Sequence, residues 1–191
     1  MAFSSVHEMI DLCKESGKPL YEVILESDLA ESGLTRAESE AEMHRLWAVM
    51  QATSDGYCGA DRSMSGFAGG DAAKVNAAAA RGVLYADGYF AEALKTAECN
   101  ACMKRIVAAP TAGSCGVLPA VLLPLQRRGL ADEAAVHRAL YIAAGFGQVV
   151  AARATLAGAE GGCQAEVGAA SGMAAAALVD IKGGTAEQCA E

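Results

Sequence analysis

Only three charged side chains occur between residues 139 and 179, namely Arg153, Glu160 and Glu166. Alanine and glycine fill most of the remaining positions in this stretch. Alanine is the best helix former, whereas strands favour β-branched and aromatic side chains. Helices that are apolar on every side must be buried, and small side chains allow them to pack closely. The stretch therefore predicts central helices that the rest of the fold surrounds.

The rest of the chain favours the same class of fold. Aromatic residues make up only 5% of the 191 residues, and no run alternates cleanly between polar and apolar side chains. We therefore predict one all-α domain over residues 1–191, with peripheral helices in 1–52, a glycine-rich loop in 53–70 and a helical core in 71–191. The expected helices span residues 4–16, 19–30, 35–51, 71–81, 90–108, 117–128, 132–152 and 164–181.

Capping residues mark several of the expected helix ends. Ser4 or Ser5 can cap the first helix, and Gly17 can end it. Thr35 and Glu38 have the spacing of a capping box, in which each side chain hydrogen-bonds to the other residue's backbone. These signals indicate where the N-terminal helices begin and end.

Composition and charge exclude several classes of function. The net charge is −8, and lysine and arginine form no blocks, so binding to nucleic acid or to an anionic membrane is not expected. The longest apolar stretch, 139–152, contains Gln148 and is followed by Arg153, which disfavours a membrane span. No N-terminal pattern typical of a secretory signal is visible, and the seven cysteines are an odd number. We therefore expect a cytoplasmic protein with reduced thiols.

The segment "APTAGSCGVLPA", residues 109–120, predicts a tight turn that leads into a helix. Pro119 suits the first turn of that helix, and Gly116 would allow the backbone to approach a ligand closely. Ser114 and Cys115 then lie at the helix N-terminus, where backbone N–H groups and the helix dipole favour an anion and lower the pKa of a thiol. A small carboxylate could bind here. A tight turn capped by a serine explains the same residues.

Cys163 has a similar setting. Glycines lead the chain to it in "GAEGGC", and "QAEVGAASG" continues as a helix. A thiolate is stabilised near a helix N-terminus, and thiolate is the form that binds soft metals. The alternative for a lone cysteine is a buried core residue.

The other cysteines and the histidines carry weaker signals. Cys99 and Cys102 form a Cys-x-x-Cys pair within an expected helix, and without a second pair or a strand–helix context we interpret them as packed thiols. The histidines lie on polar helix faces, where we expect solvated side chains rather than a catalytic base or a metal site; they are His7, His44 and His137.

Two long motifs closely resemble those of a known family. "IVAAPTAGSCGVLPAVLL" (106–123) and "GAEGGCQAEVGAASGMAAAALV" (158–179) resemble the alpha chain of the iron–sulfur-dependent L-serine dehydratases. "SGFAGGDAAK" (65–74) and, more loosely, "ESGKPLYEVILESD" (15–28) are similar as well. The resemblance runs through essentially the whole chain.

The resemblance implies a helical catalytic domain with glycine-rich active-site loops and a four-iron, four-sulfur cluster. Three cysteines would hold the cluster and leave one iron open, and Cys163 matches the first of these ligands. The other two are expected beyond Glu191, so residues 1–191 would be a truncated alpha chain that holds no stable cluster, is inactive alone and self-associates. The start at Met1 implies a two-subunit form with a separate beta subunit as partner.

The implied reaction is the conversion of L-serine to pyruvate and ammonia. An open iron would act as a Lewis acid on the substrate hydroxyl while a base removes the Cα proton. No residue is assigned as the base. The turn supplies the candidates for binding the substrate carboxylate: Thr111, Gly113, Ser114, Cys115 and Gly116. The loop would form a lid or a second wall through Ser65, Gly69 and Gly70.

Two other readings stay open. The chain could belong to a related cluster enzyme that acts on another small amino acid, such as a cysteine desulfidase, or it could be a non-catalytic helical scaffold with buried cysteines. Pyridoxal phosphate is not expected, because no strand–loop–helix pattern surrounds Lys74 or Lys95. A homo-oligomer is expected, because the surface that would meet the missing C-terminal helices is left apolar and exposed.

Overall fold

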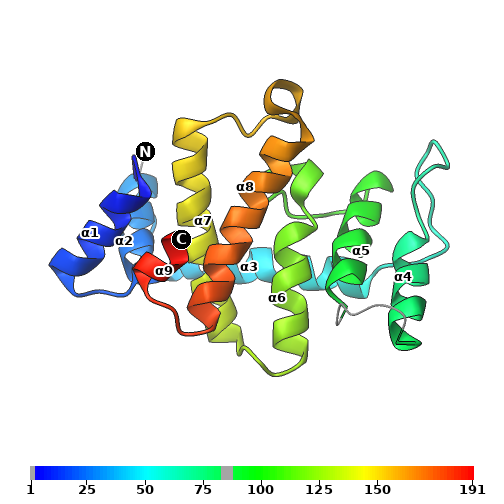
Figure 1. Ribbon diagram of the computed structural model, residues 1–191, viewed down its shortest axis with the longest axis horizontal. Coiled ribbons are helices and arrows are strands. Elements are labelled where there is room, and N and C mark those ends of the chain that lie inside the picture. The colour runs from blue at the N-terminus through cyan, green and yellow to red at the C-terminus, as the bar shows by residue number, and fades with distance from the viewer. Residues whose placement is uncertain (1–2, 83–87) are drawn as a thin grey trace.

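The computed structural model describes residues 3–82 and 88–191, and this part of the chain forms helices and no strand (Figure 1). The all-α prediction is therefore confirmed. The helices, with one short 3-10 turn named η1, are α1 Val6–Ser16, α2 Leu20–Ser32, α3 Arg36–Asp55, α4 Asp71–Ala80, α5 Tyr89–Ala101, η1 Ala112–Ser114, α6 Val117–Arg127, α7 Glu133–Arg153, α8 Gly158–Ile181 and α9 Ala186–Ala190. Among them, none is long and apolar enough to cross a membrane.

The N-terminal helices begin and end at the capping residues that the sequence marks. The Ser5 side chain accepts a hydrogen bond from the Glu8 N–H, and α1 ends at Gly17, whose φ of 67° lies in the left-handed region. Thr35 and Glu38 form the complete capping box at the start of α3. Local side-chain chemistry therefore sets these boundaries.

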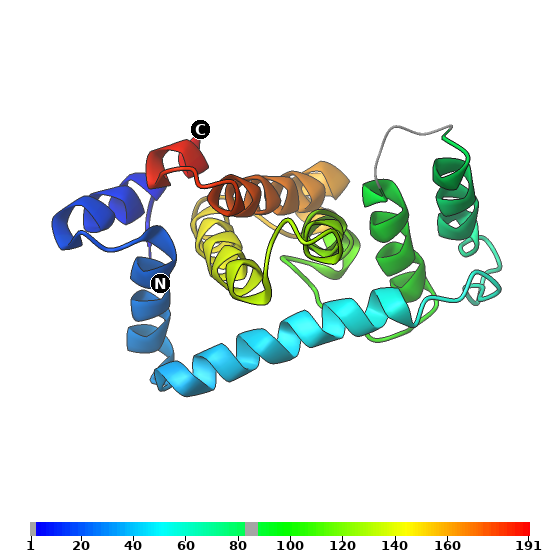
Figure 2. The same cartoon turned by 90° about the horizontal axis from the view of Figure 1, so that it is seen from below.

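The two apolar helices lie at the centre, as predicted. In Figure 1, α7 and α8 stand side by side in the middle of the molecule, with α6 next to α8. Helices α1, α2 and α9 lie at one end and α4 and α5 at the other. Figure 2 shows α3 as one long helix that runs beneath this row from α2 toward α5. The glycines and alanines of α7 and α8 permit this close packing.

Two clusters of buried side chains hold the row together. The first lies between α3, α6, α7 and α8 and includes Trp47, Leu122, Leu140 and Met173. The second joins the N-terminal helices to α7, α8 and α9 and includes Met9, Ile24, Ile142, Ala176 and Cys189. Burying each large apolar side chain contributes about 1.5–3 kcal/mol, so the two clusters are the main source of stability. Both clusters contain buried side chains of α7, which therefore packs on both sides and lies at the centre.

The predicted helix over 90–108 is too long. Helix α5 ends at Ala101, Cys102 caps it, and Met103 takes a left-handed φ of 59°. The Lys104 N–H donates to the Cys99 carbonyl at 2.9 Å, which closes the helix end. Cys99 and Cys102 therefore lie at the end of a helix rather than within one. The left-handed position carries no glycine, so the sequence gives no stop signal there.

Three further features of the helices differ from the prediction. Helix α3 continues to Asp55, so the loop spans residues 56–70. Helix α8 contains a break at Gly162, where φ is 73° and ψ is 175°, so its continuous part begins beside Cys163. The short helix α9 was not predicted, although Thr185 and Gln188 form a capping box at its start.

Candidate active site

The turn over residues 111–116 connects α5 to α6 and has an exposed and a buried side. Ala112 and Gly113 are exposed, whereas Ser114, Cys115 and Gly116 are buried. The hydroxyl oxygens of Thr111 and Ser114 lie 3.1 Å apart and share a hydrogen bond. The part of the turn that solvent reaches is therefore Thr111–Gly113, with Ser114 behind it.

The turn rests directly on α5. A β-carbon on Gly116 would lie 2.5 Å from the carbonyl oxygen of Ala93, so the backbone approaches α5 there. The Asn100 side-chain amide donates to the Ala112 carbonyl at 3.1 Å. Gly116 is thus needed for helix packing and not, as its place in the motif suggests, for the approach of a ligand.

The expected low pKa at Cys115 is wrong. Its side chain is 2% exposed, and burial raises the pKa of the thiol to about 11. The Sγ lies 4.0 Å from the Thr96 carbonyl of α5. Desolvation outweighs the helix dipole here, so Cys115 is a neutral packed thiol at pH 7.

The structure brings the second motif to the same place. A β-carbon on Gly113 would lie 2.6 Å from Oε2 of Glu166, and one on Gly158 would also lie 2.6 Å from that atom. The half-buried Glu166 carboxylate therefore fills the space between the turn and the beginning of α8. Sequence reasoning did not single out Glu166, although its place three residues after Cys163 was visible.

Cys163 lies at the beginning of the continuous part of α8, and it is exposed. Among the described residues, none other than its chain neighbours has an atom within 4 Å of the position that a β-carbon on Gly162 would take, so the backbone next to Cys163 faces open space. An accessible cysteine at a helix start next to open space is suited to binding a metal centre. The role of Cys163 as a cluster ligand stays a prediction.

The other cysteines lie in different surroundings. Cys58, Cys99 and Cys102 line a small pocket at the C-terminal end of α5. Cys189 is buried in the cluster around α1, α2 and α9. An iron–sulfur cluster is held by several thiolates. Of the described cysteines, only Cys163 and Cys115 belong to the two motifs of the candidate site, and Cys115 is buried. The residues present therefore fit one ligand of a cluster and leave the remaining ligands unassigned.

The loop 56–70 is tied to α5 through Glu98. The Glu98 carboxylate, which is buried, accepts hydrogen bonds from the N–H groups of Gly70, Asp71 and Ala72 at 2.9, 2.7 and 3.1 Å. The Tyr57 hydroxyl donates a fourth at 2.6 Å. Glu98 thereby caps α4 from a neighbouring helix and closes the base of the loop.

The candidate loop residues are held in different ways. Gly70 is the buried end of the loop, whereas Ser65 is exposed and its hydroxyl oxygen lies 3.1 Å from that of Ser63. Gly69 has a φ of 128°, and a β-carbon there would lie 2.2 Å from the Asp61 carbonyl oxygen. Helix α5 lies between α4 and α6 in both views, so it also separates this loop from the turn (Figures 1 and 2).

Hydrogen bonding decides the charge of Glu98. Burial by itself raises the pKa of this carboxyl, but the hydrogen bonds from Tyr57 and the three backbone N–H groups outweigh it and lower the pKa. The pKa of Tyr57 rises to about 12, because of burial and its bond to Glu98. Both groups therefore keep their ordinary charge at pH 7.

We expect Glu98→Gln to destabilise the fold by about 3 kcal/mol, because an amide cannot accept all four bonds and leaves buried donors unpaired. The pKa of Glu98 is lower in the folded state, so its contribution is present above the ordinary value of 4.5 and is lost as pH falls below it. Urea denaturation at pH 7 and at pH 4 measures both effects.

The matched control is Glu38→Gln, which removes an exposed carboxylate from the capping box of α3. It should have a smaller effect, because water replaces the lost bonds. Equal destabilisation by the two variants, or an unchanged pH dependence in Glu98→Gln, would show that Glu98 has no special role.

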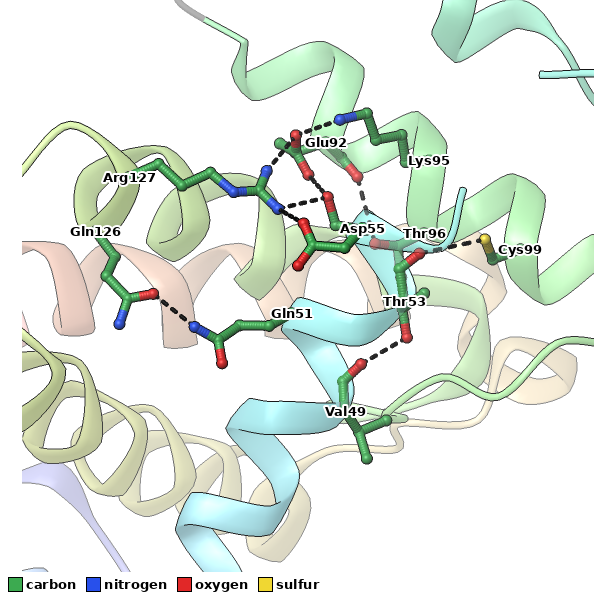
Figure 3. Close-up of polar contacts among 11 residues, drawn as sticks. Val49, Gln51, Thr53, Asp55, Glu92, Lys95, Thr96, Cys99, Gln126 and Arg127 are labelled. Carbon is green, nitrogen blue, oxygen red and sulfur yellow. Dashed lines mark hydrogen bonds and ion pairs between the residues drawn. The ribbon is translucent and has the colours of Figure 1, made fainter. Parts of the chain in front are cut away.

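A second buried carboxylate joins α3, α5 and α6 (Figure 3). Glu92 accepts hydrogen bonds from Lys95 at 2.6 Å, from Arg127 at 2.8 Å and from the Ser54 hydroxyl. Arg127 also contacts Asp55 at 2.6 Å. Burial alone raises the pKa of Glu92, yet these partners outweigh it and lower the pKa. The network fixes α5, and hence the turn that rests on it, against α3 and α6.

Two of the three histidines are exposed to solvent, as the sequence predicts. His7 and His44 are exposed, but the His137 side chain is only 14% exposed and packs against His44. The helical spacing placed His137 on a polar face. The long helix α3 covers that face, which only the packing of α3 on α7 reveals.

A family model and several known proteins match this chain, and all of them are named as serine dehydratases. A family model described as "Serine dehydratase alpha chain" matches residues 15–191. The chain is 38% identical over 190 residues to the L-serine dehydratase alpha chain of Peptoniphilus asaccharolyticus, which covers 97% of this chain and 65% of that protein. It is 39% identical over 194 residues to the probable L-serine dehydratase alpha chain of Bacillus subtilis, with 99% and 64% covered. The chain thus spans slightly less than two thirds of these relatives.

A more distant relative is the L-serine dehydratase TdcG of Escherichia coli. The identity is 31% over 202 residues, which covers 97% of this chain and 43% of that protein. The match to all three relatives includes both long motifs, because it covers nearly the whole chain.

Proposed function

Because this chain belongs to the family of serine dehydratase alpha chains, we propose that it forms the helical catalytic part of an enzyme that converts L-serine to pyruvate and ammonia. One observation of the structure supports this most. The turn 111–116 and the beginning of α8, two segments far apart in the sequence, meet through Glu166 at Gly113. The turn that we propose to bind the substrate carboxylate, the Glu166 carboxylate and the helix start that carries Cys163 are therefore neighbours.

We further propose that the active enzyme carries a four-iron, four-sulfur cluster and that Cys163 is one of its ligands. The exposure of this thiol and the open space at the neighbouring Gly162 support the assignment. Such a cluster, when bound, supplies a Lewis acid that makes the substrate hydroxyl a better leaving group.

The substrate carboxylate would bind at the exposed side of the turn. Backbone N–H groups at a helix start and the Thr111 hydroxyl suit an anion of this size. The Ser114 hydroxyl, 3.1 Å from that of Thr111, would orient it from behind. The substrate would therefore be held by its carboxylate, with its Cα directed toward the groups at the beginning of α8.

Glu166 is the acidic group that the structure places against this turn, and we propose it as the base that removes the Cα proton. Removal of the proton from Cα and loss of hydroxide from Cβ leave an enamine. The enamine tautomerises to an imine, and water hydrolyses the imine to pyruvate and ammonia.

The partners follow from the same proposal. The names of the relatives speak of an alpha chain, and we propose that a separate beta chain completes the enzyme. A cytoplasmic location with reduced thiols would suit both the cluster and the soluble substrate.

The test is an anaerobic assay of the assembled enzyme, with iron and sulfide analysis of the same preparation. Pyruvate formation from L-serine with bound iron supports the proposal. Release of sulfide from L-cysteine without turnover of serine would favour the desulfidase alternative. A folded protein that binds no iron and turns over neither amino acid would be a scaffold.

We expect Ser114→Ala to raise the KM for L-serine about 10-fold while kcat and iron content stay unchanged. Loss of a hydrogen bond that helps to hold a charged group costs about 1.5–3 kcal/mol, and 1.4 kcal/mol corresponds to a factor of ten. Steady-state kinetics measure the effect, with Ser32→Ala at the end of α2 as control. An unchanged KM would assign the turn to structure alone.

A further inference from the structure

Three potential metal ligands meet where α3 crosses the beginning of α7. Glu133 and His137 are one helical turn apart on α7, and His44 faces them from α3. Oε1 of Glu133 lies 3.5 Å from Nδ1 of His44 and 3.8 Å from Nε2 of His137. One ligand atom from each of the three residues lies within 4.8 Å of the other two.

The geometry of the two rings leaves one nitrogen without a partner. The ring centroids of His44 and His137 are 3.8 Å apart, with an angle of 70° between the planes. Nε2 of His137 is buried, and it has no hydrogen-bond partner within the described structure. A buried polar atom without a partner is costly, and a bound ligand would satisfy it.

The cluster is open to solvent on one side. His44 and Glu133 remain accessible from solvent, so an ion can enter from their side.

We propose that His44, Glu133 and His137 form a zinc site that fastens α3 to α7. Two histidines and one glutamate are a ligand set of zinc enzymes. Ligands of tetrahedral zinc at about 2.0–2.1 Å lie about 3.3 Å from one another, so the observed separations need only small side-chain movements. A pocket of about 230 Å³ adjoins both histidines, so water can approach the two rings from that side.

This site is separate from the candidate active site. It lies at the beginning of α7, whereas Cys163 follows the end of that helix. Zinc here would stabilise the contact of α3 with α7 without touching the turn or Glu166.

Histidine NMR tests the proposal directly, because the chain has only three histidines. The two exposed thiols are first replaced, as Cys58→Ser and Cys163→Ser, so that they do not compete for zinc. Titration with zinc chloride should shift the ring nitrogens of His44 and His137 at one equivalent and leave those of His7 unchanged. Ring signals of His44 and His137 that do not move at saturating zinc would overturn the proposal.

Affinity measurements provide the second test. His44→Ala, His137→Ala and Glu133→Gln should each weaken zinc binding by more than about 100-fold, because even residues behind the ligands contribute 10–100-fold. His7→Ala is the matched control and should bind as before. Circular dichroism checks that each variant is folded, and Glu133→Gln, at an exposed position, covers the case in which a histidine variant unfolds.

Thermal unfolding gives a readout that depends neither on the NMR spectrum of the histidines nor on serine dehydration. Zinc at about 100 times its dissociation constant should raise the midpoint by about 5–10 °C, and His137→Ala should lose this shift.

Cobalt, bound in place of zinc, should give the visible absorption of a four-coordinate site with nitrogen and oxygen ligands. A spectrum that shows only thiolate charge transfer, or an equal thermal shift in His137→Ala, would refute the site.

Discussion

Cys163→Ser is expected to abolish serine dehydration in the assembled enzyme and to reduce its iron content. A hydroxyl is a poor ligand for a centre that takes thiolates. Because changes behind the ligands already cost 10–100-fold, loss of a ligand should lower activity by more than about 100-fold. The measurements are pyruvate formation and iron analysis of anaerobically prepared enzyme.

The matched control is Cys58→Ser, which removes the other exposed thiol among the described residues. It should keep both activity and iron. Full iron content and turnover in Cys163→Ser would remove this residue from the ligand set. Loss of activity with full iron content would instead give Cys163 a role in the reaction without ligation.

Glu166→Gln is expected to lower kcat by about 10²–10⁴-fold, which is the usual contribution of a positioned base. The amide keeps the size of the side chain, so the contact with Gly113 and Gly158 should persist and iron content should stay the same. The KM for L-serine should change little, because the proposed carboxylate site is the turn. Solvent exchange of the Cα proton gives an independent measure, and it should slow in parallel with kcat.

Glu160→Gln is the control for Glu166→Gln. Glu160 is exposed near the beginning of the same helix and accepts a hydrogen bond from Thr155 at 2.7 Å. It should leave kcat unchanged. If Glu166→Gln raises KM without lowering kcat, Glu166 shapes the turn and the base is another group.

Local chemistry made many of the helix boundaries predictable. Ser5 and the pair Thr35 and Glu38 act on backbone groups within three residues, so their effect is visible in the sequence. The end of α5 was not predictable in this way. The exposed Met103 occupies a left-handed position without a glycine, and backbone hydrogen bonds from Met103 to Asn100 and from Lys104 to Cys99 close the helix there.

The motifs indicate where the candidate site lies, but not which side chains meet there. Cys163 and the turn 111–116 were recognisable from their glycines and from the family resemblance. That Glu166 lies against Gly113 depends on how α8 packs beside the turn. The pKa of Cys115 was predicted with the wrong sign, because a motif shows the helix N-terminus but not the burial of the thiol.

The sequence alone determined that the chain is helical, that α7 and α8 are central, and which motifs relate it to its family. The reason is that helix propensity, capping and the lack of charge act within one segment. Only the tertiary structure decided which side chains meet: Glu98 with the first N–H groups of α4, Glu92 with Arg127, and His44 with His137. These pairs join segments far apart in the chain. Their free energy depends on distance and burial, which exist only once the helices have packed.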